Sequence, residues 1–435
     1  MSSPLKVLIF SGARGDTRRY RTFHLAQQAR LAGLDCTLTH YASPSLPARL
    51  DEAQVAILHR VDADDYILRL VHRFKQAGGV LIGDTDDYVF DEQAIQWIDS
   101  PDFADPIRTR LYRQDLQRRR RLLEACDAVL ASTPYLKEQV EKLNLPAFLH
   151  RNAFSLEMLS ASEQAQQHKK PAGEQVVFGY ASGTPTHNRD FALIAPVLKG
   201  ILARCPQAAL HVIGYLDLDS SWSVFGNRVV QQPAVPWRDL PPILAGFDVN
   251  LAPLVSDNPF GLSKSEIKFV EAALVLTPTV ASRTPAFESA IQDGQTGWLA
   301  ESPEEWDARL ESLLAAPTRR RLAERAYQDV LLKYHPLVRA NQLLVTLKEI
   351  LLHAGRASLV EPLNQALAAR SYPSHEELHT SRFWIDPALE THPNRFEQGM
   401  YTLLHRSPAE LPQRIWVFFR RLAVPWFPFH PHPKG

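Results

Sequence analysis

The sequence predicts an α/β protein of two doubly wound domains that face each other across a cleft, followed by a C-terminal extension. Short apolar runs of β-type residues alternate with longer helical patterns, which is typical of parallel sheets covered by crossover helices. One polar, aperiodic stretch at residues 160–174 interrupts this alternation, which then restarts. We therefore expect one sheet before the stretch and a second sheet after it.

The first domain is expected to cover residues 1–160. Its short apolar runs predict strands at 6–11, 36–40, 55–58, 79–82 and 128–131. Amphipathic patterns predict helices at 21–32, 65–76, 107–126 and 134–143. A turn rich in Gly and Arg separates the first strand from the first helix.

Residues 161–175 are expected to form a linker, and residues 176–335 the second domain. Its predicted strands are 176–180, 209–214, 229–231, 249–251 and 279–281, and its helices are 190–204, 237–245, 267–274, 287–292, 304–314 and 318–333. A helix over 336–352 is expected to return towards the first domain. Residues 353–435 are rich in Pro, His and Trp, lack the strand–helix alternation, and are expected to form a C-terminal extension.

Composition limits the classes of function. The 435 residues include 48 Lys+Arg and 48 Asp+Glu, so the net charge gives no argument for a nucleic-acid partner. Cys36, Cys126 and Cys205 are far apart and lack CxxC spacing, which predicts neither a disulfide framework nor a zinc site. The N-terminal residues do not read as a signal peptide, and no run approaches the ~20 apolar residues of a membrane-spanning helix. We expect a cytoplasmic protein.

Several ordered segments of the second domain match a known pattern at plausible spacing. They are 248–254, 258–261, 264–273, 277–282, 287–289 and 293–300. Together these segments resemble the C-terminal half of the GT4-type glycosyltransferases, also called group 1 glycosyl transferases, which are retaining enzymes of the GT-B fold. The resemblance implies two Rossmann-like domains, with the donor bound in the second domain and the acceptor in the first.

The resemblance also implies the reaction. A sugar passes, with retention, from a nucleotide-sugar donor to a glycan, a lipid-linked molecule or a small molecule. The nucleotide sugar is a substrate, and no cofactor or bound metal is expected. The alternatives are a nucleotide-sugar 2-epimerase on the same fold and a sugar-nucleotide-binding protein without catalysis.

The segment 264–273 is expected to bind the donor. By the resemblance, Glu271 accepts hydrogen bonds from the ribose. Lys268 lies three residues earlier on the same predicted helical face and can reach a phosphate, and Lys264 is assigned to the donor with it. The alternative is an exposed helical Lys–Glu pair.

The first strand–loop–helix unit of the second domain supplies a second donor element. Gly183 permits a close approach of the backbone, and Ser182 and Thr184 offer hydroxyl groups. His187 and Arg189 can add positive charge near a phosphate. An ordinary βα turn with a Ser or Thr cap is the alternative.

One position departs from the family pattern. The family has a Glu that faces the hexose eight residues before the ribose Glu, and this sequence has Ser263 there. A competing register that pairs Asn258 with Glu266 misplaces Pro278 by five residues. Asp257 and Glu266 are therefore the candidates for the missing carboxylate, and Glu266 is assigned a catalytic role.

Polar residues follow two predicted strands of the first domain. Asp84, Asp86 and Asp87 come at the end of one strand, and His59 at the end of another. Asp86, Asp87 and His59 are assigned to catalysis or the acceptor, because a histidine can transfer a proton at this position. A divalent-cation site, helix capping and a structural histidine are the alternatives.

The turn after the first strand lacks the GxGxxG spacing of a dinucleotide site. By the resemblance it borders the acceptor, with Arg14, Arg18 or Arg19 facing a phosphate or carboxylate. Gly12, in the same turn, is assigned to the donor.

In residues 413–429, aromatic and apolar side chains at helical spacing are flanked by arginines. This pattern suits peripheral contact with an anionic lipid surface, at the inner face of a membrane. Packing of the same residues against the first domain is the alternative.

Overall fold

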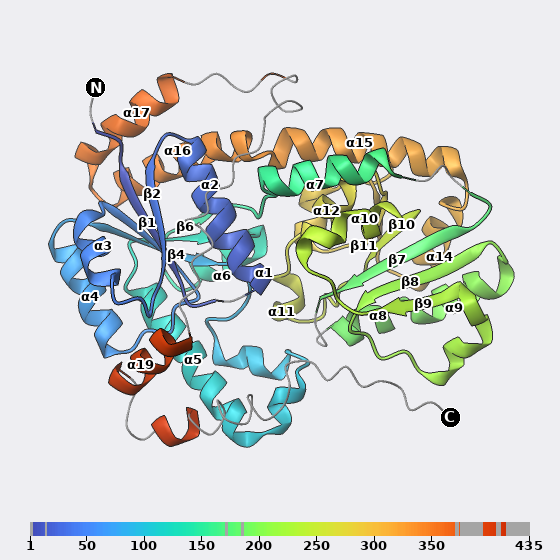
Figure 1. Ribbon diagram of the computed structural model, residues 1–435, viewed down its shortest axis with the longest axis horizontal. Helices are drawn as coiled ribbons and strands as arrows, with labels where there is room; N and C mark the ends of the chain where they lie inside the picture. The colour runs from blue at the N-terminus through green and yellow to red at the C-terminus, as the bar shows by residue number, and fades with distance from the viewer. Residues whose placement is uncertain are drawn as a thin grey trace.

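The computed structural model describes residues 3–13, 15–169, 173–183, 187–369, 374, 395–405 and 410–414. Within these residues the chain forms two six-stranded sheets, and each sheet is covered by helices (Figure 1). All pairings between the named strands are parallel. The predicted α/β class with two sheets and a helical C-terminal part is confirmed.

The first sheet has the strand order β2-β1-β3-β4-β5-β6. Its strands are β1 Lys6–Ser11, β2 Asp35–His40, β3 Val55–His59, β4 Val80–Thr85, β5 Ala128–Ala131 and β6 Ala147–Leu149. Strands β3, β4 and β5 are buried along their whole length, as expected for parallel strands covered on both faces, which explains their continuous apolar runs. The sequence did not predict the short edge strand β6.

Helices and helical turns connect the strands of the first domain along the chain. They are α1 Gly15–Arg18, the π-helical turn η1 Arg19–Phe23, α2 His24–Leu31, α3 Leu46–Glu52, α4 Asp65–Gln76, the 3-10 turns η2 Glu92–Gln96 and η3 Pro101–Ala104, α5 Pro106–Glu124 and α6 Pro134–Glu141. Asp64 caps α4 by accepting a hydrogen bond from the Ile67 amide at 2.9 Å. The predicted helices of this domain are present, and α1, α3 and the turns η2 and η3 are additional.

The second sheet has the strand order β12-β11-β10-β7-β8-β9. Its strands are β7 Val176–Ser182, β8 Ala208–Gly214, β9 Val229–Gln232, β10 Val249–Ala252, β11 Thr279–Ser282 and β12 Trp298–Ala300. Its helical segments are α8 Asn188–Ala192, α9 Ala195–Arg204, η5 Ser220–Arg228, η6 Trp237–Asp239, α10 Leu240–Ala245, α11 Pro259–Leu262, α12 Ile267–Ala273, α13 Pro285–Ala290, α14 Pro303–Ser312 and α15 Ala316–Tyr334. The predicted helix 190–204 is divided into α8 and α9, because Pro196 has no backbone N–H to donate to the carbonyl of Ala192 at the end of α8.

The expectation of an irregular linker from residue 161 was wrong for residues 161–167. These residues belong to helix α7, Leu156–Gln167, which Ser155 caps by accepting from the Met158 amide. Leu156, Met158 and Leu159 are buried at its start, but the later buried positions are small residues, Ser and Ala. Because these buried residues are small and only weakly apolar, the stretch shows no helical pattern of large apolar residues, and its sequence is like that of a loop.

Helix α16, Pro336–His353, follows α15 after a short break at His335. Figure 1 shows α15 over the second domain and α16 over the first, where α16 packs on α2. The chain therefore returns to the first domain after completing the second. The turn η7 Ala357–Leu359 and the helix α17 Val360–Ala368 follow α16 and pack beside it.

Part of the C-terminal extension lies on the first domain. In helix α19, Arg395–His405, the Tyr401 hydroxyl donates to Asp64 at 2.6 Å, and the His405 ring stacks on Tyr66 at 4.0 Å. Farther on, Arg414 pairs with Asp115 at 2.6 Å. Most of the aromatic segment 413–429 lies outside the described residues. Among the helices that the structure describes, none combines the length and apolar character needed to cross a membrane.

The packing of β7 on Phe247 can be tested at Gly179, because a Cβ at this position would lie 1.9 Å from the Phe247 ring. Such a contact forces the ring or the strand to shift. We expect Gly179→Ala to lower the free energy of unfolding by roughly 1–3 kcal/mol in chemical denaturation. Gly183→Ala is the matched control, because a Cβ at Gly183 meets nothing within 4 Å. Equal stabilities of the two variants would contradict the packing described.

Candidate functional site

The two domains meet where the carboxyl ends of their parallel strands face each other. Residues that follow β1 and β4 contact residues of the second domain that follow β10. A small pocket of about 20 Å³ lies between them, with Trp97 and Asp99 on one side and His187, Arg189 and Lys264 on the other. Open parallel α/β sheets bind ligands at this edge, so the candidate site lies here.

His59 and Asp86 lie together at the first-domain side of this cleft. His59 Nε2 lies 3.1 Å from Asp86 Oδ1, and His59 Nδ1 lies 3.2 Å from Ser11 Oγ. Arg60 Nε donates to the same Asp86 oxygen at 2.7 Å. Burial alone would raise the pKa of Asp86, but Arg60 and His59 outweigh it and hold that pKa well below its usual value. Asp86 is therefore ionised at neutral pH.

Gly12 supports this arrangement through its backbone. Its amide donates to the His59 carbonyl at 3.0 Å, and a Cβ at Gly12 would lie 2.4 Å from the Arg60 carbonyl oxygen. Arg60 itself has a φ of 47°, in the left-handed region. The glycine lets β1 approach the end of β3, which is a structural reason for its presence instead of the expected donor contact.

Asp87 reaches across to the second domain. Its carboxylate accepts from Lys264 Nζ at 2.9 Å, from Arg60 Nη2 at 3.1 Å and from Ser263 Oγ at 3.1 Å. Ser263 is the position at which the sequence departs from the resemblance. The first domain therefore brings a carboxylate to the place where the family pattern has a glutamate.

Asp84 has a different surrounding from Asp86 and Asp87. Both its oxygens accept from Arg21, at 2.9 and 2.5 Å, and Arg21 also donates to the His150 carbonyl. Asp84 is 2% exposed. Each of the three carboxylates thus has a cationic partner, and within the described part of the chain no cluster of His, Cys, Asp or Glu suits a metal ion.

Glu266 is not placed for the expected catalytic role. Its side chain is 1% exposed, and Oε1 accepts from Arg151 Nη1 at 3.0 Å and from the Tyr334 hydroxyl at 2.7 Å. The pKa of Tyr334 is well above its usual value, because burial and the nearby carboxylate both disfavour the phenolate. Glu266 joins α12 to the end of α15 and to the segment between the domains, which is a structural role. Asp257, the other candidate, is an exposed residue 3.8 Å from Arg189.

Glu271 and Lys268 lie on one turn of α12, as predicted. Glu271 Oε1 accepts a hydrogen bond from the Tyr20 hydroxyl of the first domain, and burial raises the pKa of this carboxyl. Lys268 Nζ lies 4.6 Å from the centroid of the Tyr180 ring, and within the described residues it has no hydrogen-bond partner. Burial lowers the pKa of Lys268 to about 8. An unpartnered ammonium beside a carboxylate is suited to a ligand that carries both an anion and hydroxyl groups.

The turn after β7 lies at the same edge of the second sheet. His187 Nδ1 lies 2.8 Å from Asp190 Oδ2, and burial lowers the pKa of His187. Arg189 is half exposed at the pocket, and Ser182 is buried at the end of β7. Gly183 has open space beside it. Thr184 lies outside the described residues, as does Arg14 in the first domain.

Arg18 and Arg19 were expected to face the acceptor, and both are buried. Arg18 is 1% exposed with its guanidinium 4.9 Å from the Phe23 ring, and burial lowers its pKa to about 10. Arg19 lies between the rings of Tyr20 and Trp237, at 4.4 and 4.8 Å. Neither guanidinium is open to an acceptor in this arrangement.

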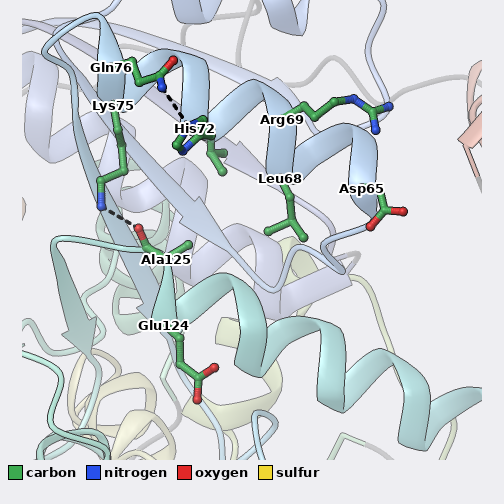
Figure 2. A pocket seen from close by; sticks show the side chains of 9 residues that line it. Asp65, Leu68, Arg69, His72, Lys75, Gln76, Glu124 and Ala125 are labelled. Carbon is green, nitrogen blue, oxygen red and sulfur yellow. Dashed lines mark hydrogen bonds between the residues drawn. The ribbon is translucent and has the colours of Figure 1, made fainter.

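A larger groove of about 800 Å³ lies on the outer surface of the first domain. Figure 2 shows it between α4 and the end of α5, with Lys75 Nζ donating to the Ala125 carbonyl at 2.7 Å. None of the residues expected in the site lines it. The groove is separate from the cleft between the sheets.

Solved structures share the architecture of this chain. A glycosyltransferase from Rickettsia africae is 11% identical, with a TM-score of 0.55, over 80% of this chain and 99% of that chain. A sucrose-phosphate synthase from Thermosynechococcus elongatus is 14% identical, with a TM-score of 0.53, over 80% and 100%. Anabaena Alr3699/HepE in complex with UDP and glucose is 13% identical, with a TM-score of 0.51, over 79% and 100%. The chain has the GT-B fold.

Sequence comparison points to the same class through the second domain. A model of the family described as glycosyl transferase-like matches residues 193–345, the part of the GT-B fold that contains Lys268 and Glu271. A D-inositol 3-phosphate glycosyltransferase of Segniliparus rotundus is 30% identical over 172 residues. That match covers 39% of this chain and 31% of the relative, so it spans about a third of the relative's length.

The effect of the buried Lys268 ammonium on stability can be measured without a ligand. Because an unpaired buried charge is costly, we expect Lys268→Met to raise the free energy of unfolding at pH 7 by roughly 1–3 kcal/mol. The pKa of Lys268 is about 8 in the folded protein, and that of a lysine in the unfolded chain is about 10.4. Between these two pH values the unfolded wild type binds one more proton than the folded wild type, so its free energy of unfolding rises with pH. The stability difference between Lys268→Met and wild type therefore shrinks as the pH rises. Urea unfolding at pH 7 and pH 10 measures both effects.

Lys348→Met serves as the control for this comparison, because Lys348 lies on α16, away from the cleft. A Lys268→Met variant that is less stable than wild type at pH 7, or whose advantage grows with pH, would contradict the assignment of an unpaired ammonium.

Proposed function

We propose that this protein is a GT4-type glycosyltransferase that transfers a sugar from a nucleotide-sugar donor to an acceptor in the cleft between its domains. The single observation that carries the proposal is the pair on α12, where Glu271 offers a carboxylate and Lys268 an unpartnered ammonium. A ribose diol needs a hydrogen-bond acceptor, and a diphosphate needs a cation beside it. The fold and the match over residues 193–345 support the proposal.

In this proposal the donor binds along the carboxyl edge of the second sheet. Glu271 accepts hydrogen bonds from the ribose, and Lys268 neutralises the diphosphate. Lys264, which now pairs with Asp87, and the half-exposed Arg189 lie beside the same pocket and add positive charge as the diphosphate departs. Anabaena Alr3699/HepE, which shares the fold, is described with UDP and glucose, which agrees with this class of donor.

The first domain supplies the acceptor side. Asp86 is ionised and is held in place by His59 and Arg60, so its carboxylate can accept a hydrogen bond from an acceptor hydroxyl and orient it. Asp87, held by Ser263 and Lys264, replaces the absent glutamate of the family pattern near the hexose. Closure of the domains excludes water, so that the sugar passes to the acceptor with retention instead of to solvent.

For the acceptor we propose one of three classes: a glycan, a lipid-linked molecule or a small molecule. Peripheral contact of the C-terminal segment with a membrane, and a cytoplasmic location, also stay predictions. In α19, which precedes that segment in the sequence, the side chains of Leu403 and Leu404 are exposed, at 53 and 68%.

Incubation with a panel of nucleotide sugars tests the proposed reaction. Formation of a glycosylated product with an added glycan or lipid-linked acceptor is the expected result. Isotopic exchange at C2 of the sugar without an acceptor would indicate a 2-epimerase. Donor binding with neither reaction would indicate a sugar-nucleotide-binding protein.

Glu271→Ala is expected to weaken the binding of a nucleoside diphosphate by roughly 1.5–3 kcal/mol, the scale of hydrogen bonds to a charged group. Calorimetry with UDP, GDP and ADP measures the affinity. Glu324→Ala is the control, because Glu324 is exposed on α15. If Glu271→Ala binds the same nucleotide as tightly as Glu324→Ala, the donor assignment fails.

We also propose that turnover needs no divalent cation, since Asp84, Asp86 and Asp87 are already engaged by Arg21, Arg60 and Lys264. The transfer rate is expected to survive excess EDTA unchanged. A loss of activity in EDTA that Mn²⁺ or Mg²⁺ restores would contradict this part of the account.

A further inference from the structure

We propose that Tyr20 is an interdomain latch that competes with the donor ribose for Glu271. This inference rests on the proposed function, because it takes Glu271 as the acceptor of the ribose hydroxyls. Tyr20 belongs to η1 of the first domain and Glu271 to α12 of the second. Their hydrogen bond joins residues 251 positions apart and holds the two domains together at the donor site.

The Tyr20 hydroxyl donates a hydrogen bond to Glu271 Oε1. Burial and the neighbouring carboxylate raise its pKa well above the usual value, so the phenol keeps its proton. A ribose diol that binds Glu271 has to donate to the same carboxylate. The Tyr20 ring is 9% exposed and packs with Phe154, Met158 and Phe269 in one apolar cluster. The Tyr20 hydroxyl thus occupies Glu271 Oε1, and a ribose diol that takes both carboxylate oxygens has to displace it.

Arg19 attaches the same segment to the second domain. Its guanidinium lies 4.8 Å from the Trp237 ring, and its Nη1 lies 3.0 Å from Met158 Sδ. Asp16 pairs with Arg19 Nε at 3.1 Å and orients it. Residues 19–23 form a π-helical turn, an irregular geometry that recurs at functional sites. The latch is thus a short, irregular segment with two contacts across the cleft.

The latch gives the donor site two states. With Tyr20 on Glu271 the carboxylate is engaged, and with Tyr20 displaced it is open to a ribose. A ligand that binds only the open state has its affinity reduced by the fraction of molecules in that state. Removal of the Tyr20 hydroxyl should therefore tighten nucleotide binding, whereas loss of an ordinary binding residue weakens it.

Calorimetric titration of Tyr20→Phe with UDP, GDP and ADP tests the latch. We expect the dissociation constant of the nucleotide that binds wild type best to fall on the order of tenfold. Inorganic diphosphate, which has no ribose, is expected to bind wild type and variant equally. An unchanged or weaker nucleoside diphosphate affinity in Tyr20→Phe would overturn the proposal.

Tyr215→Phe is the matched control, because Tyr215 is a half-exposed tyrosine whose hydroxyl donates to Asp217 and not to Glu271. Its affinities should equal those of wild type. The two proposals fail separately. If adding Glu271→Ala to the Tyr20→Phe variant, which already lacks the latch, leaves nucleotide affinity unchanged, the donor assignment fails. If Glu271→Ala weakens binding while Tyr20→Phe has no effect, only the latch fails.

Wild-type protein provides a second measurement that does not depend on a variant. Hydrogen exchange of the amides of residues 19–23 should become faster when the nucleoside diphosphate is added, because Tyr20 is released from Glu271. Slower or unchanged exchange in this segment, with nucleotide bound, would overturn the latch.

Discussion

The carboxylate of Asp87 joins the two halves of the candidate site. It accepts hydrogen bonds from Arg60 of its own domain and from Ser263 and Lys264 of the other. Arg60 in turn holds Asp86 on His59, so the proposed acceptor side depends on the same cluster that positions Lys264 at the proposed donor side. Because these groups are little exposed, removing one partner leaves the others uncompensated, which is costly. Their geometry is consequently tied to the closed arrangement of the domains.

Charge is distributed unevenly across this cleft. The buried acids of the first domain have cationic partners, whereas Lys268 of the second domain lacks a hydrogen-bond partner among the described residues. A protein gains nothing in stability from an unpaired buried ammonium, so its presence favours a function that needs it. Diphosphate binding would supply the missing anion. Glu271 accepts from a tyrosine hydroxyl of the other domain, whereas Glu266 Oε1 accepts from Arg151.

The sequence predicted the alternating strands and helices that make up most of both domains. Continuous apolar runs located strands such as β3 and β5, because parallel strands are buried on both faces. The three-residue strands β6 and β12 were missed, since so short a run carries no period, and α7 was missed because small residues occupy its buried side.

The candidate site was predictable where it follows one helix. The spacing of Lys268 and Glu271 places both on α12, and this could be read from the sequence. Contacts between the domains could not, because Tyr20 lies 251 positions from Glu271 and Asp87 lies 176 positions from Ser263. The substitution at position 263 was visible, but its partner was not. Glu266 was misassigned because sequence distance from the motif cannot distinguish a residue at the cleft from one held beneath it.

A structure of the protein with the nucleoside diphosphate that binds it most tightly tests the central claim most directly. The account predicts the diphosphate within hydrogen-bond distance of Lys268 Nζ and the ribose hydroxyls on the carboxylate of Glu271. A nucleotide bound elsewhere, for example in the groove between α4 and α5, with Lys268 and Glu271 free of it, would contradict the account.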